Sequence, residues 1–414
     1  MEFKKYIVEE LVQKNMLEKP LDGNHGNKHP KSSDYTEQGI PFIMVSDISN
    51  GRINYNTCKF ISKKQRDTLD KGFSKEGDVL LSHKATIGLT CIVDNKYPEI
   101  VITPQLTYYR VKKDINNYYL KYYFDSPYFQ NILKNWATSG STRAYLGITA
   151  QLKLPILLPD LIIQNKIATI LQTIDRKIEL NTHTNNNLYK LSKTIFRDFY
   201  NSNSEKWNIC KINDIGLYIS DYVANGSFKS LAQNVKIYDN KNYALFIRNT
   251  DLKVNFTQGR KYVDEHSYNF LSKSKLYGRE LIISNVGDVG SIFLCPSFEI
   301  PMTLGNNVIM IDSKETKVNY NYYLYYFFLS AEGQYLIDGI TGGSAQPKFN
   351  KTDFKNSLIK LPSKEDILEF NDKIIPMYDI IEKNIKENDI LEQLRDTLLP
   401  KLMNGEIDLD KVEI

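Results

Sequence analysis

Two histidines, His25 and His29, have a spacing at which imidazoles can share a metal ion. They stand in a stretch that contains glycine, asparagine and proline, which favours a loop rather than a helix. No cysteine or glutamate lies close by to complete a ligand set. We therefore expect loop histidines and no bound metal.

Asp78 and the segment Asp94-Asn95-Lys96 imitate the carboxylates and lysine of a metal-dependent nuclease. A later stretch of similar sequence has Glu280 and Cys295-Pro296-Ser297 at the matching positions, so the lysine is missing there. A solvated turn is the better interpretation of the first group.

Cofactor and nucleophile motifs are missing from the sequence. It contains no GxGxxG, no GxxxxGK[ST], no GxSxG and no Pro-Pro dipeptide of the kind a DNA methyltransferase places beside a flipped base. The segment Thr341-Gly342-Gly343-Ser344 is glycine-rich but lacks the phosphate-binding lysine. We expect a protein without catalytic chemistry of its own.

The chain has 414 residues, of which 42% are hydrophobic and 25% charged, with a formal net charge of +4. These values are typical of a globular protein, and the length predicts two or more domains. The four cysteines show no CxxC spacing, and charges occur throughout Met1–Glu10, which argues against a secretory signal. We expect a cytoplasmic protein. The small positive charge agrees with a polyanionic partner without identifying one.

The sequence repeats itself at an offset close to 203 residues. The matching segments include Asp22-Gly23-Asn24-His25 with Asn225-Gly226-Ser227-Phe228, Lys59-Phe60-Ile61 with Lys261-Tyr262-Val263, and Asn117-Tyr118-Tyr119-Leu120 with Asn321-Tyr322-Tyr323-Leu324. Because the offset stays nearly constant along the chain, we expect two similar half-molecules.

Each half has the same order of expected elements. Short strands come first, at 41–45, 78–82 and 106–111 in the first half and at 244–248, 280–284 and 308–312 in the second. Helical segments rich in aromatic residues follow at about 117–136 and 321–336, and each half closes with a long helix after a Leu-Pro pair.

The closing helices carry apolar residues at the spacing of a coiled-coil seam. The seam positions are Ile167, Ile174, Asn181, Leu188 and Ile195 in the first helix and Ile381, Asn384, Leu391 and Leu398 in the second. Asn181 and Asn384 are duplicate positions and would fix the register of the seam. Pro376 is expected to kink or delay the second helix. The alternative is two ordinary amphipathic helices on separate cores.

Several segments together resemble the specificity subunit of type I restriction–modification systems, and the resemblance covers essentially the whole chain. The opening of each half is similar to the start of the family's target-recognition domain. The ending, Leu394-Arg395-Asp396-Thr397-Leu398-Leu399-Pro400-Lys401-Leu402 followed by Asn404-Gly405-Glu406-Ile407, resembles the family's characteristic C-terminus. The first copy keeps only the apolar positions of this ending, in Leu191 to Phe196.

The resemblance implies an α+β fold with two β-rich target-recognition domains, at 1–160 and 204–362. Two long antiparallel coiled-coil helices, within 161–203 and 363–414, would join them. It also implies double-stranded DNA as a partner, two docked methyltransferase subunits and possibly restriction subunits. S-adenosylmethionine would be bound by the methyltransferase subunits, which flip the target adenine, and this chain would bind no cofactor.

Base reading needs polar side chains on loops between strands, with lysine and arginine on phosphates. In the first half we expect DNA contacts from Asn24, His25, Lys28, Ser82, His83, Lys84, Gln105 and Arg143. In the second half we expect them from Ser227, Lys229, Asn285, Asn306, Gln346 and Lys348. Because the loops differ, the two halves should select different bases, which gives an asymmetric bipartite site.

Two other functions remain open at this point. A stand-alone restriction–methylation enzyme would need a cofactor motif, which the sequence lacks. A scaffold of two β-rich modules on a coiled-coil strut, with no DNA role, would show the same duplication.

Overall fold

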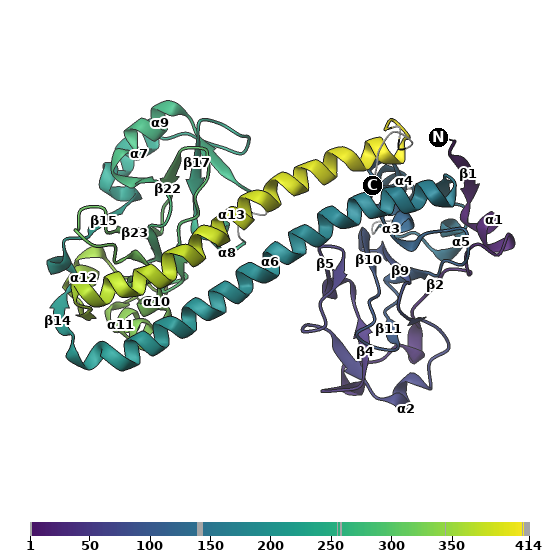
Figure 1. Ribbon diagram of the computed structural model, residues 1–414, viewed down its shortest axis with the longest axis horizontal. Coiled ribbons are helices and arrows are strands. Elements are labelled where there is room, and N and C mark those ends of the chain that lie inside the picture. Colours follow the sequence, from purple (N-terminus) through teal and green to yellow (C-terminus); the bar gives the residue numbers. More distant parts are fainter. Residues whose placement is uncertain are drawn as a thin grey trace. The chain divides into compact units, whose positions relative to one another are not determined.

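The computed structural model describes residues 2–138, 144–254, 256, 259–343, 345–407 and 409. The chain forms two compact units, of which unit 1 comprises Met1–Leu180 and Glu387–Ile414, and unit 2 comprises Asn181–Lys386. Unit 1 is thus built from both ends of the chain and unit 2 from its middle (Figure 1). The predicted α+β class, with a duplicated β-rich part and two long helices, is confirmed.

Unit 1 begins with short strands and ends in helices. Its strands are β1 (Lys4–Ile7), β2 (Leu21–Asp22), β3 (Tyr35–Thr36), β4 (Ile40–Ile43), β5 (Ile48–Ser49), β6 (Arg52–Ile53), β7 (Lys59–Ile61), β8 (Phe73–Ser74), β9 (Val79–Lys84), β10 (Thr86–Ile92), β11 (Ile100–Ile102), β12 (Leu106–Tyr109) and β13 (Pro155–Leu158). Its helices are α1 (Val8–Gln13), α2 (Lys63–Arg66), α3 (Asn117–Asp125), α4 (Pro127–Thr138), α5 (Ile148–Gln151) and the first part of α6 (Leu161–Asn203).

Unit 2 repeats this order. Its strands are β14 (Asn208–Lys211), β15 (Tyr218–Asp221), β16 (Ile237–Tyr238), β17 (Ala244–Ile247), β18 (Lys261–Val263), β19 (Lys275–Leu276), β20 (Leu281–Ser284), β21 (Ile292–Leu294), β22 (Met302–Leu304), β23 (Val308–Asp312) and β24 (Leu358–Leu361). Its helices are α7 (Phe228–Asn234), α8 (Asn249–Lys253), α9 (Glu265–Phe270), α10 (Asn321–Leu329), α11 (Ala331–Ile340), α12 (Lys351–Asn356) and most of α13 (Lys364–Met403).

The sheets of the two units have the same topology. In unit 1 a four-stranded sheet has the order β10-β9-β12-β2, and a five-stranded sheet has the order β3-β7-β4-β11-β8. In unit 2 the corresponding sheets are β21-β20-β23-β15 and β16-β18-β17-β22-β19. Each five-stranded sheet contains one parallel pair, β4 with β11 and β17 with β22. The internal duplication predicted from the sequence is therefore a duplication of fold.

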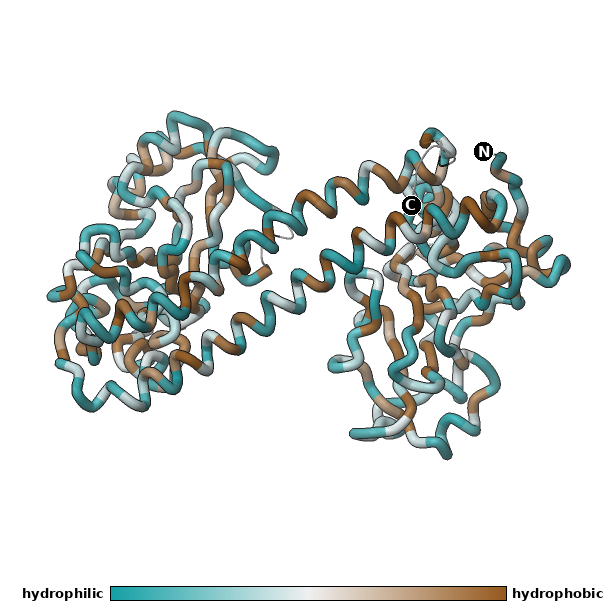
Figure 2. The backbone as a smooth tube through the Cα atoms, viewed as in Figure 1, coloured by the Kyte–Doolittle hydropathy of each residue, from teal (hydrophilic) through white to brown (hydrophobic). Residues whose placement is uncertain are grey.

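Each unit has a core that its sheet shares with both long helices. In unit 1, Leu81 of β9 and Tyr123 of α3 are buried together with Leu171 of α6 and Leu402 of α13. In unit 2 the aromatic helix α10 is buried against α6 and α13. Hydrophobic and hydrophilic stretches alternate along both long helices, as a seam requires (Figure 2).

Within each unit, α6 and α13 run antiparallel. In unit 1, Lys177 forms an ion pair with Glu387, and Asp175 forms one with Arg395 at 3.1 Å. In unit 2, Asn384 Nδ2 donates to Asn185 Oδ1 at 2.8 Å. The helices therefore pack on each other rather than only on separate cores.

The structure corrects two details of the sequence interpretation, the delay of the second helix at Pro376 and the alignment of the opening loops. Helix α13 begins at Lys364, after the capping residue Ser363, and continues through Pro376, so Pro376 does not delay it. The opening loops were also aligned in the wrong register. Asp22 pairs with Thr107 of β12, and Asp221 pairs with Ile309 of β23. Because β12 and β23 are duplicate strands, Asp22 corresponds to Asp221.

The cause of the register error is a local insertion. In unit 2 a 3₁₀ turn at Tyr222–Asn225 follows Asp221, and it lengthens the loop relative to unit 1.

In the part of the chain that the structure describes, no helix is both long and apolar enough to cross a membrane.

Candidate functional site

In unit 1, one end of the four-stranded sheet gathers segments that are distant in sequence. They are the turn between β9 and β10, the turn before β12, and residues 144–146, which we call the strap. Lys84 and Tyr145 form an isolated backbone bridge. The His83 N–H donates to Gln105 O at 3.0 Å, and the Leu146 N–H donates to His83 O at 2.9 Å.

Unit 2 has the same arrangement, with a strap at residues 347–349. Val286 and Lys348 form the backbone bridge that matches Lys84 and Tyr145. The Asn285 N–H donates to Asn307 O, and the Phe349 N–H donates to Asn285 O, both at 3.1 Å. Most of the loop residues that the sequence singled out lie at this end of the sheet.

Three of the predicted residues in unit 1 are buried and hold the loops together. Asn24 donates through Nδ2 to Lys71 O at 2.5 Å and accepts from the Asp70 N–H at 3.0 Å. Ser82 Oγ accepts from the Leu89 N–H at 2.8 Å. These contacts fix the shape of the surface that the exposed loop residues share.

His83 is the third buried residue, with 1% of its surface exposed. Its Nδ1 donates to Leu146 O at 3.0 Å, which ties β9 to the strap. Its Nε2 is buried and has no hydrogen-bond partner. Burial lowers the pKa of His83 because the imidazolium would lose its hydration, so the neutral ring is favoured. In unit 2, Asn285 makes the same contact, from Nδ2 to Phe349 O at 3.3 Å.

Several charged side chains lie around the loop after β2. His25 Nε2 lies 2.6 Å from Asp22 Oδ2, and Lys71 Nζ also donates to Asp22. Burial alone would raise the pKa of Asp22, but the hydrogen bonds from Lys71 and His25 outweigh it and keep the pKa below its usual value. Lys28 pairs with Asp70 on the surface at 2.5 Å.

The other predicted residues of unit 1 reach the surface to different degrees. Lys84 is exposed, with its Nζ 5.9 Å from the centre of the Tyr145 ring, and Gln105 is half-buried. Arg143 lies outside the described residues.

The predicted residues of unit 2 form two groups. Asn285, Asn306 and Lys348 belong to the turns and strap at the sheet end, and Gln346 directly precedes the strap. All but the half-buried Asn285 are exposed. Ser227 and Lys229 lie at the start of α7, where Ser227 Oγ accepts from the Ser230 N–H at 3.2 Å. Among the described residues, no hydrogen bond joins Ser227 or Lys229 to the turns and strap.

The predicted seam residues also differ in burial. Ile167, Ile174, Asn181, Ile381 and Asn384 are buried, whereas Leu188, Ile195, Leu391 and Leu398 are half-buried. Asn384 pairs with Asn185, which the seam prediction did not include. Asn185 and Asn388 are duplicate positions, so their matching offset was a usable signal.

Tyr145 is a second residue that the sequence interpretation missed. It is 46% exposed on the strap of unit 1, with its ring 5.8 Å from that of His83. The offset of 203 matches it to Lys348, which was predicted, so aligning the straps would have found it.

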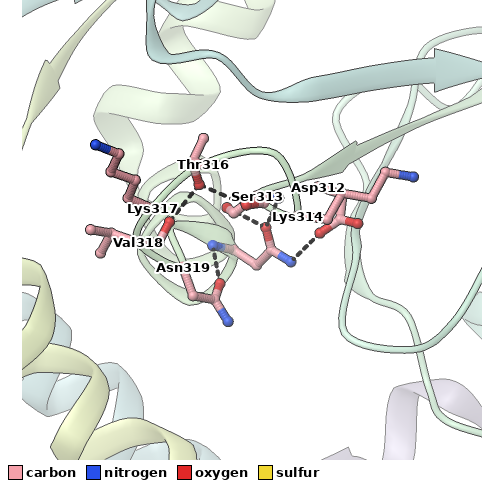
Figure 3. Close-up of a pocket in the computed structure, with 8 residues that line it drawn as sticks. Asp312, Ser313, Lys314, Thr316, Lys317, Val318 and Asn319 are labelled. Carbon is pink, nitrogen blue, oxygen red and sulfur yellow. Dashed lines mark hydrogen bonds between the residues drawn. The ribbon is translucent and has the colours of Figure 1, made fainter.

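Unit 2 also contains a shallow pocket of about 240 Å³ between β23 and α10. Its lining residues are Asp312, Ser313, Lys314, Thr316, Lys317, Val318, Asn319 and Asn321. Asn321 accepts from the Ser313 hydroxyl at 2.7 Å and donates to Asp312 at 3.1 Å, and these bonds brace the loop (Figure 3). The pocket lies at the opposite end of β23 from the strap.

The strap ends carry groups suited to binding rather than catalysis. They present lysines, amides and an exposed tyrosine, which can donate hydrogen bonds to acceptors on a large ligand. Within the described ranges, no cluster of three or more His, Cys, Asp or Glu could hold a metal ion.

Sequence comparison matches both halves to one family. A sequence profile described as the type I restriction modification DNA specificity domain matches residues 11–190 and 204–399. The MjaIX specificity subunit of a type I restriction enzyme from Methanocaldococcus jannaschii is 26% identical, over 92% of this chain and 90% of its own. The HindI specificity subunit from Haemophilus influenzae is 21% identical, over 89% of this chain and 94% of its own.

A solved structure has the same fold. The crystal structure of the type I restriction-modification S subunit from M. genitalium superimposes with a TM-score of 0.60 at 13% sequence identity. The superposition covers 97% of this chain and 96% of that one.

Proposed function

This chain belongs to the type I restriction modification DNA specificity family, and we propose that its two units read the two halves of an asymmetric bipartite DNA site. It is the DNA-recognition subunit of such a system, and methyl transfer and cleavage belong to other subunits. The proposal adds to this role the assignment of one half-site to each unit.

One observation carries the proposal. In both units, the strap and the two turns beside it form the same end of the four-stranded sheet, with the same backbone hydrogen bonds. The side chains at matching positions nevertheless differ. Lys84 and Tyr145 in unit 1 correspond to Val286 and Lys348 in unit 2. Because base pairs are distinguished by their donor and acceptor patterns, different side chains on the same frame select different bases.

In this proposal the predicted residues have two different roles. The buried Asn24, Ser82 and His83 would shape the loops, whereas exposed residues such as His25 and Lys84 would touch DNA. Lysines on this surface would contact phosphates and set the register, and polar side chains would contact base edges.

The proposed partners are double-stranded DNA, two methyltransferase subunits and possibly restriction subunits, in the cytoplasm. S-adenosylmethionine would be held by the methyltransferase subunits and not by this chain. The target-recognition domains would span 1–160 and 204–362, and the helical regions 161–203 and 363–414 would contact the methyltransferase subunits.

The form of the methylated site tests the proposal. Single-molecule sequencing of host DNA, with and without this gene, should reveal a motif of two different half-sites separated by a nonspecific spacer. The motif should vanish when the gene is deleted and return with a plasmid copy. No gene-dependent motif would favour the scaffold alternative, in which the chain has no DNA role.

A further inference from the structure

Tyr145 has neighbours on three sides yet remains open to solvent. The His83 ring lies 5.8 Å away, the Lys84 ammonium lies 5.9 Å from the ring centre, and Gly147 lies beneath the hydroxyl. Despite these contacts, 46% of the residue is exposed. An exposed tyrosine with packed neighbours offers a large contact area and, with only two side-chain torsions, loses little conformational entropy when it binds a ligand.

Gly147 makes room for this ring. A Cβ added at Gly147 would lie 3.0 Å from Tyr145 Oη and 3.3 Å from two ring carbons. The duplicate position in unit 2 is Asn350, whose side chain caps α12 by accepting from the Asp353 N–H at 2.9 Å. In unit 1, Gly147 precedes α5 and has no side chain to cap that helix, and the tyrosine ring lies beside it.

The matched pair in unit 2 has a different chemistry. The bridge Lys84–Tyr145 corresponds to Val286–Lys348. The lysine therefore lies on the turn in unit 1 and on the strap in unit 2, and unit 2 has no aromatic ring at this pair of positions. Lys348 is exposed and Val286 half-buried. On frames with the same backbone hydrogen bonds, the two sheet ends thus differ in charge and shape at this pair of positions.

We propose that Tyr145, positioned with Lys84 on the strap of unit 1, is a specificity-determining residue that contacts a base pair of the first half-site. This inference rests on the proposed function. The Lys84 ammonium and the Tyr145 hydroxyl can both donate hydrogen bonds, so the favoured base edge is one rich in acceptors, as guanine presents through N7 and O6.

The test compares variants of Tyr145 in the complex with its methyltransferase subunits. The gene with Tyr145→Ala or with Tyr145→Lys replaces the wild type in the host, and the methylated motif is read by single-molecule sequencing. Tyr128→Ala is the matched control, because Tyr128 is a 43% exposed tyrosine at the start of α4 in the same unit. Duplexes carrying each single base change of the wild-type motif are then used in competition binding.

We expect Tyr145→Ala to weaken base specificity at one position of one half-site and to leave the other half-site unchanged. Discrimination at that position should fall roughly tenfold, as for loss of one base contact. Tyr145→Lys, which carries the residue type of the matching strap, should change the preferred base. Tyr128→Ala should leave the motif intact.

Three results would overturn the inference. The motif could stay unchanged in both variants, methylation could fall equally at all sites, or both variants could fail to assemble while Tyr128→Ala assembles. The last two would make Tyr145 a structural residue. If the wild type itself gave no bipartite motif, the proposed function would fail instead, so the two failures are distinct.

Discussion

The two units share a fold but stabilise equivalent positions by different chemistry. In unit 1 the buried Asp78 accepts two hydrogen bonds from Arg110, each at 2.8 Å. In unit 2 its counterpart is Glu280, and the position of Arg110 is taken by Asp312. Glu280 accepts hydrogen bonds from the Tyr277 N–H at 2.6 Å and the Gly278 N–H at 2.9 Å.

The helix contacts show the same contrast. In unit 1, Tyr122 of α3 donates to Asp175 of α6 at 2.6 Å, and Asp175 also pairs with Arg395. At the duplicate positions of unit 2, the Tyr326 and Tyr378 hydroxyls are 2.8 Å apart. The apolar pattern and strand order thus determine the fold, and the polar chemistry at each position is free to change. The units should therefore respond differently to the same perturbation.

The largest difference should come from Arg110→Met. It leaves the carboxylate of Asp78, which is 1% exposed, without its cation, and unit 1 should lose about 3 kcal/mol of unfolding free energy. Trp136 of unit 1 and Trp207 of unit 2 are the two tryptophans of the chain, so single-tryptophan backgrounds report each unit in urea unfolding. Unit 2 should be unaffected. Equal loss in both units would contradict the contrast.

A smaller effect is expected from Asn185→Leu in unit 2. It leaves the buried Asn384 amide without its acceptor, which should cost about 1–2 kcal/mol. The double variant Asn185→Leu with Asn384→Leu should recover part of that loss, because no unpaired amide remains. Asn186→Leu, at an exposed neighbouring position of α6, is the control. A double variant less stable than the sum of the single ones would refute this explanation.

The pH dependence contributed by Glu280 in unit 2 and by Asp22 in unit 1 should have opposite sign. Burial raises the pKa of Glu280, and the nearby Asp312 adds to this. The folded unit thus binds this proton more tightly than the unfolded chain does. The stability contributed by Glu280 is therefore complete below the ordinary glutamate pKa and is lost as pH rises through the raised value.

Unit 1 contains the opposite case in Asp22, whose pKa is lowered. Its contribution is present above the ordinary aspartate pKa and is lost as pH falls through the lowered value. Urea midpoints measured from acid to neutral pH should lose the contribution of Glu280 at the alkaline end in unit 2 and the contribution of Asp22 at the acid end in unit 1. Glu280→Gln should remove the alkaline loss. Its persistence in that variant would assign the loss to another group.

The smallest effect is expected from His83→Asn. Asn285 makes the matching contact to the strap of unit 2, so an asparagine at position 83 should keep the contact to Leu146 O. The unfolding free energy of unit 1 should therefore change by less than about 1 kcal/mol. His83→Leu removes the donor and should cost about 1–2 kcal/mol. If both variants were equally destabilised in thermal unfolding, the two contacts would not be equivalent.

Much of the fold could be predicted from the sequence because it depends on apolar periodicity. The strand predicted at 308–312 coincides with β23, and the strand predicted at 280–284 differs from β20 by one residue. The long helices followed from the spacing of residues such as Ile167 and Ile381, which are buried in the structure. Burial of apolar side chains at a fixed period is a signal that a single sequence carries.

The candidate site was harder to predict because it depends on contacts between distant segments. Polarity alone marked Asn24 and His83 as surface residues, yet both are buried and hydrogen-bonded to distant backbone, at Lys71 and Leu146. Conversely, Tyr145 has the residue type of a core position but is exposed on the strap. Which loop residues contact DNA stays a prediction.

Exchange of one unit's recognition domain tests the central claim most directly. Residues 1–158 are replaced by the first domain of another family member, and the methylated motif is read by single-molecule sequencing. If each unit reads one half-site, one half of the motif should change while the other half stays the same. A motif that changed in both halves, or one that proved to be a single uninterrupted palindrome, would contradict the account.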